Sequence, residues 1–213
     1  MRPLPFAGLG LGLAALLGAC ASQPVKPTLT VDRGACDTSP MLAPAAPLNF
    51  DLRDEKTTDV QLDKQSRCLE VDGARDYYAV YDLPRADQPY SLAVGAIPEG
   101  TSLPSLQVVL LDAQGTVSRR LTASQFQFRG DRFVALFKSR QNEARMIVQS
   151  DHALVGQELS RIQERTETNV ISGIAGHVAF FGSLHTGEDK TVSNTFSYTG
   201  RLIVTITPIP TAS

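Results

Sequence analysis

The stretch that decides the fold lies near the middle of the chain and has the sequence Leu106-Gln107-Val108-Val109-Leu110-Leu111-Asp112-Ala113-Gln114-Gly115. Residues 106–111 are almost continuously apolar, a pattern typical of a buried β-strand. Residues 112–115 are the small and polar types that favour a hairpin turn. The stretch therefore predicts a buried strand that turns back on itself.

Alternation of apolar and polar residues extends this pattern along the chain. Tyr90, Leu92, Val94 and Ala96 share one face of a predicted strand. Arg129-Gly130-Asp131 is predicted to be a hairpin turn rather than an adhesion motif. Further strand patterns lie at 48–52, 69–71, 77–81, 126–128, 133–137, 146–148 and 202–206. Short strands parted by turn residues predict an all-β fold, an antiparallel β-sandwich of jelly-roll or immunoglobulin-like type over residues 48–213.

One surface α-helix is predicted near 151–165, because apolar residues recur there at helical spacing behind a capping residue. Ser150 or Asp151 is the cap, and the apolar stripe consists of Val155, Leu159 and Ile162. Its narrow stripe indicates a helix that lies over the sandwich.

The segment after this helix has two interpretations. Residues 170–184 are apolar and rich in glycine. They form either a buried connection, which we favour, or an exposed patch that binds a partner. Residues 186–194 are polar and predict a flexible loop.

The amino terminus has the features of an export signal. Arg2 precedes an uncharged apolar run, Leu4 to Ala19, which is shorter than the ~20 residues that a bilayer span needs. The run ends in Leu17-Gly18-Ala19-Cys20, which resembles the bacterial lipobox. We therefore expect residues 1–19 to be a lipoprotein signal peptide and Cys20 to carry a lipid; the alternative is an ordinary leader cut after Ala19. Ala21 follows in place of aspartate, which favours an outer-membrane anchor facing the periplasm.

Residues 20–47 are predicted to be the lipid anchor and a tether rich in proline and alanine. Lipidation of Cys20 leaves Cys36 and Cys68 as an even pair. In an oxidising compartment this pair predicts a disulfide, worth about 3–4 kcal/mol for a loop of about 33 residues; the alternative is two independent thiols.

Composition and motifs limit the chemistry that we expect. A net charge of -2 gives no reason to expect nucleic acid as a partner. No motif for a catalytic nucleophile, zinc protease or nucleotide loop is present, and His152, His177 and His185 are scattered. We therefore predict no enzyme activity, no catalytic residue, no metal site and no cofactor. Four acidic residues near the first strands either bind calcium or, as we favour, form a solvated strand edge: Glu70, Asp72, Asp76 and Asp82.

The run from Leu48 to Pro208 is similar to the maltose operon periplasmic protein family. The resemblance rests on Pro47-Leu48-Asn49-Phe50, on Tyr78 to Pro84, on Tyr90 to Val94 and on Leu106 to Asp112. It continues through Met146-Ile147-Val148, a helix resembling 151–165 and a last strand like 201–207. The chain departs from the family in its lipobox and in ending soon after the last strand.

The resemblance implies a non-enzymatic accessory factor in maltose or maltodextrin transport, with the outer-membrane sugar porin as a partner and no established binding residues. Weak sugar binding would use tyrosines, since Trp is absent. Tyr78, Tyr81 and Tyr90 are the candidate ligand contacts, although core packing is the alternative that we favour. The competing hypothesis is a structural or assembly lipoprotein of an unrelated envelope complex.

Overall fold

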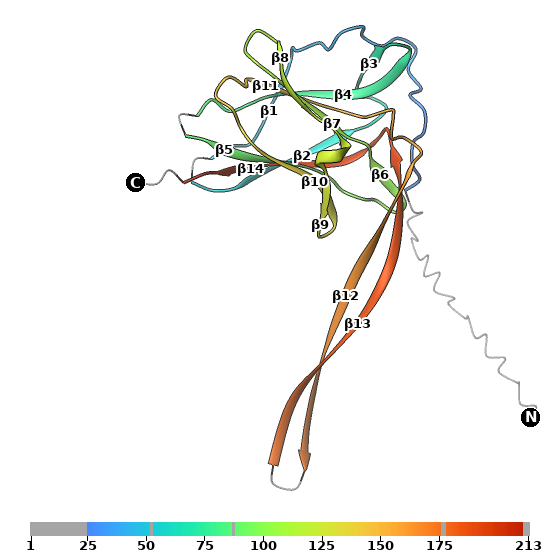
Figure 1. The fold of residues 1–213 in the computed structure, drawn as a ribbon, viewed down its shortest axis with the longest axis vertical. Helices are drawn as coiled ribbons and strands as arrows, with labels where there is room; N and C mark the ends of the chain where they lie inside the picture. Colours follow the sequence, from blue (N-terminus) through green and yellow to red (C-terminus); the bar gives the residue numbers. More distant parts are fainter. Residues whose placement is uncertain (1–24, 52, 87, 176–177, 211–213) are drawn as a thin grey trace, which may run out of the picture.

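Two mainly antiparallel sheets lie face to face and form a sandwich (Figure 1). The computed structural model describes residues 25–51, 53–86, 88–175 and 178–210, and for residues 163–189 it describes the backbone alone. The predicted all-β sandwich is confirmed. No helix in these ranges is long and apolar enough to cross a membrane.

The first sheet has six strands in the order β1-β4-β11-β7-β8, with β3 paired to β4 beside the short parallel strand β1. Its strands are β1 (Ala46–Pro47), β3 (Arg67–Val71), β4 (Ala74–Asp82), β7 (Gln107–Leu111), β8 (Val117–Leu121) and β11 (Arg145–Gln149). β7 and β8 form the hairpin that the sequence of residues 106–115 predicts. Asp112 Oδ1 accepts hydrogen bonds from the backbone N–H groups of Gln114 and Thr116, and Gly115 takes the positive φ of 85° that the turn requires.

The second sheet has five strands in the order β2-β14-β5-β10-β9. Its strands are β2 (Lys56–Leu62), β5 (Tyr90–Ala96), β9 (Gln127–Arg129), β10 (Arg132–Lys138) and β14 (Gly200–Pro208), and a 3-10 turn, Ala123–Gln125, precedes β9. Arg129 and Arg132 are paired across Gly130, which has a positive φ of 63°. Arg129-Gly130-Asp131 therefore belongs to a hairpin turn, as predicted.

The core lies between the two sheets and follows the alternation seen in the sequence. Leu92 and Val94 of β5 and Val108 and Leu110 of β7 are each 0% exposed. Burial of an aliphatic side chain of this size contributes about 1.5–3 kcal/mol, so these facing rows hold the sheets together.

The predicted surface helix at 151–165 is wrong. Residues 151–157 form turns, in which Leu154 N–H donates to Asp151 O, and Gly156 has a positive φ of 85°. A strand, β12 (Glu158–Ala175), follows directly. Val155, Leu159 and Ile162 do not form one buried stripe: Leu159 packs against the core, whereas Ile162 is 69% exposed. Pairing with a distant strand outweighs the local helical spacing.

That partner is β13 (Val178–Ser197), so residues 186–194 are strand and not the predicted loop. β12 and β13 pair in unbroken antiparallel register from Glu158 opposite Thr195 to Ala175 opposite Val178. Only the base of β13 joins another strand among the described residues, namely β6 (Ser102–Pro104). The hairpin, called the arm below (residues 158–197), projects far beyond the sandwich (Figure 1).

The part of the predicted tether that the structure describes is attached to the sandwich. Thr28 N–H donates to Ser197 Oγ at 2.8 Å. Asp37 forms a parallel bridge with Leu69, and Ala46–Pro47 pairs with β4 as β1. Residues 28–47 are therefore part of the folded domain rather than a free spacer.

Candidate functional site

The outer face of the six-stranded sheet carries a second apolar layer. Because side chains alternate along a strand, each inward residue of β4, β7 and β11 has an outward neighbour. The outward residues form a cluster in which every member is at most 7% exposed: Leu69, Tyr78, Val80, Val109, Leu111 and Ile147. An outer face this apolar needs a cover.

The cover is residues 36–45, which we call the strap. The disulfide between Cys36 and Cys68 joins the strap to β3, which confirms the predicted pairing. Asp37 N–H donates to Cys68 O at 2.8 Å, and Tyr78 Oη–H donates to Asp37 Oδ2 at 2.6 Å. Met41 N–H in turn donates to Tyr78 Oη at 2.9 Å. These contacts hold one wall of the site against the sheet.

Beside the strap the sheet face is hollowed into a groove of about 570 Å³. Volumes of roughly 300–1,000 Å³ are typical of pockets for small molecules. The groove has a floor of sheet residues, one wall from the strap and another from the β7–β8 hairpin. Its apolar lining is aliphatic: Leu42, Leu69, Val71, Val109, Leu111, Val117 and Ile147. No aromatic ring of Phe or Tyr is among the described residues that line it.

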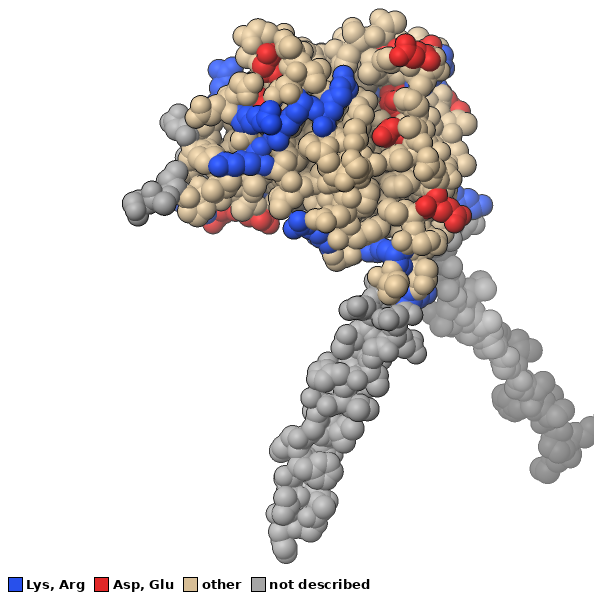
Figure 2. Space-filling model, in the orientation of Figure 1, with Lys and Arg blue, Asp and Glu red and all other residues tan. Residues whose placement is uncertain are grey.

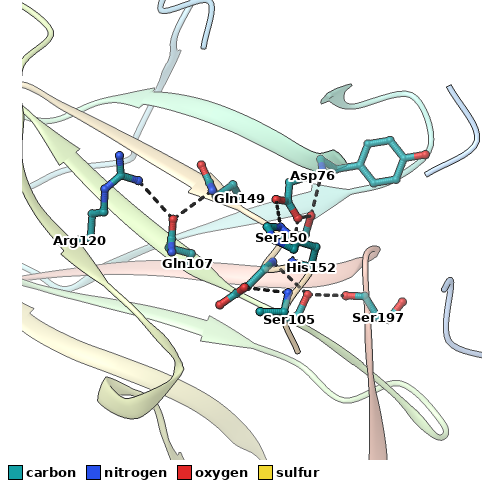
Figure 3. Close-up of polar contacts among 11 residues, drawn as sticks. Asp76, Ser105, Gln107, Arg120, Gln149, Ser150, His152 and Ser197 are labelled. Carbon is teal, nitrogen blue, oxygen red and sulfur yellow. Dashed lines mark hydrogen bonds and ion pairs between the residues drawn. The ribbon is translucent and has the colours of Figure 1, made fainter. Parts of the chain in front are cut away.

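Polar side chains border the groove where β7 begins and β11 ends (Figure 3). Gln107 and Gln149 are cross-strand partners, and Gln149 Nε2 donates to Gln107 Oε1 at 3.1 Å. Arg120 Nη1 donates to the same oxygen at 3.4 Å. Arg120 is exposed and forms no ion pair with a described carboxylate, and this amide oxygen is its one side-chain hydrogen-bond partner among the described residues.

A second polar group, around Asp76, stands near the glutamines (Figure 3). Asp76 is 7% exposed; its Oδ1 accepts from Ser150 Oγ at 3.0 Å and from His152 N–H at 2.9 Å. Its Oδ2 lies 2.7 Å from Nδ1 of His152, whose side chain is 48% exposed. Burial raises the pKa of Asp76, against the lowering effect of His152 and of its other hydrogen-bond donors.

The Ser150 hydroxyl bonds the carboxylate and not the imidazole, so Asp76, Ser150 and His152 are not arranged as a Ser-His-Asp triad. The cluster instead ties the chain after β11 to β4. Asp76 and His152 are far apart in sequence, and no local pattern signals their contact.

The four acidic residues for which calcium binding is the less favoured alternative do not form a ligand cluster, although Asp72 and Asp76 both line the groove. Glu70 pairs with Arg75 at 2.6 Å and Asp82 with Arg145 at 3.4 Å. Asp72 sits in the β3–β4 turn with a positive φ of 54°. Among the residues that the structure describes, no group of three or more His, Cys, Asp or Glu is placed to hold a metal ion.

The candidate sugar-contact tyrosines are buried, which agrees with the packing role that we favour over ligand contact. Tyr78, Tyr81 and Tyr90 are 1%, 7% and 4% exposed. Tyr81 and Tyr90 face the core, where burial raises the pKa of each to about 12. Tyr78 points outward, as the alternation allows, but lies under the strap. Sequence pattern indicates which face a residue occupies, yet it cannot show that a distant segment covers that face.

A second hollow, about 980 Å³, is lined by the loops before β5, between β7 and β8 and between β10 and β11. Its structural centre is Glu143, whose side chain is 0% exposed. Arg119 binds it in bidentate fashion, with Nε at 2.7 Å and Nη2 at 3.0 Å. The lining is mixed in charge and polarity (Figure 2). Glu143 also accepts from Arg140 N–H at 2.9 Å, and these contacts indicate a structural role for its carboxylate.

The arm is the other candidate site. Residues 168–187, on either side of its turn, contain no Asp, Glu, Lys or Arg, whereas charged residues are frequent nearer the sandwich. Arg161 anchors its base: the guanidinium donates to Gly130 O at 2.9 Å and lies 4.4 Å from the centre of the Phe128 ring. The side chains of segment 170–184 lie outside those described, so the choice between a buried and an exposed segment stays open. The side chains of His177 and His185 and the whole of Cys20 also lie outside the described part of the chain.

No known family model and no curated protein matches the chain.

Proposed function

We propose that the protein is a non-enzymatic lipoprotein of the bacterial cell envelope that docks onto a partner protein through the arm. In this proposal a lipid on Cys20 anchors the chain in the outer membrane, and the sandwich faces the periplasm. The single observation that carries the docking role is a two-stranded hairpin with strands of 18 and 20 residues that leaves the sandwich unaccompanied.

Two physical arguments support docking. A two-stranded hairpin is only marginally stable in water by itself, because three or more strands or a packed face are needed. At about 3.3 Å per residue the arm reaches roughly 60 Å, so its end is available to a molecule well away from the sandwich. An uncharged end at that distance suits contact with an apolar protein surface.

The resemblance to the maltose operon family supplies the first partner to test, an outer-membrane sugar porin. The carbohydrate context of the proposal rests on that resemblance. Buried tyrosines and an aliphatic groove give no stacking surface for pyranose rings, so docking is a better account than direct sugar binding. Assembly of an unrelated envelope complex is the second candidate, because the same arm serves it equally well.

Photo-cross-linking in living cells tests the docking role. A photoreactive residue in place of Phe180, near the end of the arm, should form an adduct with the sugar porin of the same genome. The same residue in place of Leu136, which is 53% exposed on the second sheet, is the matched control and should form none. An adduct with a secretion or pilus component would favour assembly, and no protein adduct from the arm would contradict docking.

The anchor is tested separately. Mass spectrometry of the amino-terminal peptide should show Cys20 as the first residue with a lipid mass added. A Cys20→Ala variant should leave the membrane fraction while keeping the sandwich folded. Recovery of a free Cys20 thiol in the wild-type protein would contradict the anchor without bearing on the arm.

A further inference from the structure

The chemistry of the groove beside the strap restricts what it can bind. Its floor consists of Val109, Leu111 and Ile147, which are at most 3% exposed although they face away from the core. Val71 and Val117 at its margin are 48% and 45% exposed, which leaves apolar surface in contact with water. Aliphatic side chains pack well against a hydrocarbon chain, whereas sugars are usually held by aromatic faces and hydroxyl partners.

The backbone under the groove floor offers no free strand to a peptide, because the edge strand on this side of the sheet is β8, at the margin. β7 is paired with β11 on one side and β8 on the other, and β11 is paired with β4 and β7. Their N–H and C=O groups are therefore used within the sheet. A peptide on this floor would depend on side chains or water for its N–H and C=O groups, a requirement that a hydrocarbon chain does not have.

The polar end of the groove indicates the head group. Arg120 is exposed, is the one Lys or Arg among the described residues that line the groove, and stands beside the amide of Gln107. A guanidinium binds a carboxylate through two parallel hydrogen bonds. Two carboxylates also line the groove, both across the sheet from Arg120 on β8: Asp76 faces His152, and Asp72 lies in the β3–β4 turn.

The site is also rigid before any ligand arrives. Its floor is the hydrogen-bonded sheet, and its strap wall is fixed by the Cys36–Cys68 disulfide and by Met41 N–H on Tyr78 Oη. A preformed site avoids the entropy cost of ordering on binding.

We propose that this groove binds a single acyl chain with an anionic head, of the fatty-acid type. The chain lies between Val71 and Val117, above the buried side chains of Val109, Leu111 and Ile147, and the carboxylate meets Arg120 and Gln107. The groove shares no residue with the arm, so a test of ligand binding in the groove is independent of a test of docking through the arm.

Binding is measured on the chain that begins at Ala21, which keeps every described residue and has no lipid of its own. The probe is dansylamino-undecanoic acid, whose fluorescence rises in apolar surroundings. We expect a saturable signal with one site per chain, displaced by lauric acid and not by maltohexaose. Absence of saturable binding, or displacement by maltohexaose, would overturn the proposal.

Matched variants place the ligand. Val71→Asp with Val117→Asp puts charge at the margin without touching the core and should weaken binding by about tenfold or more, since desolvating a charge opposes burial of hydrocarbon. Leu136→Asp makes the same change at an exposed site on the other sheet and should leave binding unchanged. Circular dichroism checks that each variant is folded. Equal binding by the folded margin variant and the wild type would exclude this groove.

The head group is assigned by comparing lauric acid with lauryl alcohol as competitors. Arg120→Gln should weaken the acid by about tenfold, the effect of one charge-assisted pair, and leave the alcohol nearly unchanged. An equal effect on both competitors would show that Arg120 does not hold the carboxylate.

Discussion

The sandwich and the arm are both built from antiparallel strands, yet they are stabilised in different ways. In the sandwich, strands of 5 to 9 residues such as β4, β7, β11 and β14 have partners on both edges and side chains buried on the inner face. In the arm, β12 and β13 are far longer but pair chiefly with each other. Burial of apolar side chains therefore stabilises the sandwich, whereas the stability of the arm depends on backbone pairing and on the molecule that the arm contacts.

The largest loss of stability is expected from removing the disulfide that joins the strap to β3. Cys36→Ser with Cys68→Ser should lower the free energy of unfolding by about 3–4 kcal/mol, because the unfolded chain regains the freedom of the closed loop. Urea denaturation measures the loss. Reduction of the wild-type protein is the control and should give a similar loss; a change below about 1 kcal/mol would mean that the strap does not depend on the bridge.

The next largest loss of stability is expected from breaking a buried ion pair, and it is compared with the loss from breaking an exposed one. Arg119→Met should cost about 3 kcal/mol, because it leaves the Glu143 carboxylate buried without its main partner. Arg201→Met, which breaks a solvent-exposed pair with Asp59, is the matched control and should cost less than about 1 kcal/mol. Urea denaturation of both variants gives the comparison, and equal losses would contradict the structural role assigned to Glu143.

A smaller effect is expected at alkaline pH. The pKa of Tyr81 and of Tyr90 rises from 10.0 to about 12 on burial, so the folded state holds these protons more tightly than the unfolded state. Stability is thus complete below pH 10 and falls as the pH rises toward about 12.

Tyr81→Phe removes one such phenol and should move the alkaline unfolding midpoint upward by less than about one pH unit. Circular dichroism across a pH series measures the midpoint. Tyr198→Phe, at a half-buried position, is the comparison and should move it less. A midpoint unchanged in Tyr81→Phe would show that this ring does not drive alkaline unfolding.

The smallest effect is expected from removing most of the arm. Residues 163–190 are replaced by Asn-Gly, a two-residue turn that joins Ile162 to Thr191, which face each other in the register. The sandwich should unfold within about 1 kcal/mol of the wild type, since an isolated ribbon adds little stability. A much larger loss of stability in calorimetry would mean that the arm supports the sandwich and that the two regions are not stabilised separately.

The sequence predicts the sandwich where burial and local pattern agree. Alternation at 90–96 and 202–206 identifies inward residues, and Gly115 and Gly130 mark hairpin turns. It fails at 158–165, because Glu158, Arg161 and Glu164 suit the exposed side of a helix as well as a solvated ribbon. Only the long-range pairing with β13 decides between them.

The groove could not be predicted for a related reason. Its floor is signalled by apolar runs such as 106–111, which indicate burial on both faces. Its strap wall and the contact between Asp76 and His152 bring together segments far apart in the chain. Local sequence propensity does not predict such long-range contacts. The cysteine count alone pointed to the strap, through Cys36 and Cys68.

The bridge between Cys36 and Cys68 makes one wall of the groove depend on the redox state of the chain. The sheet is held by its own hydrogen bonds, whereas the strap is joined covalently to β3 by this bridge. Under the export that we propose, that wall is covalently fixed only in an oxidising compartment, after translocation.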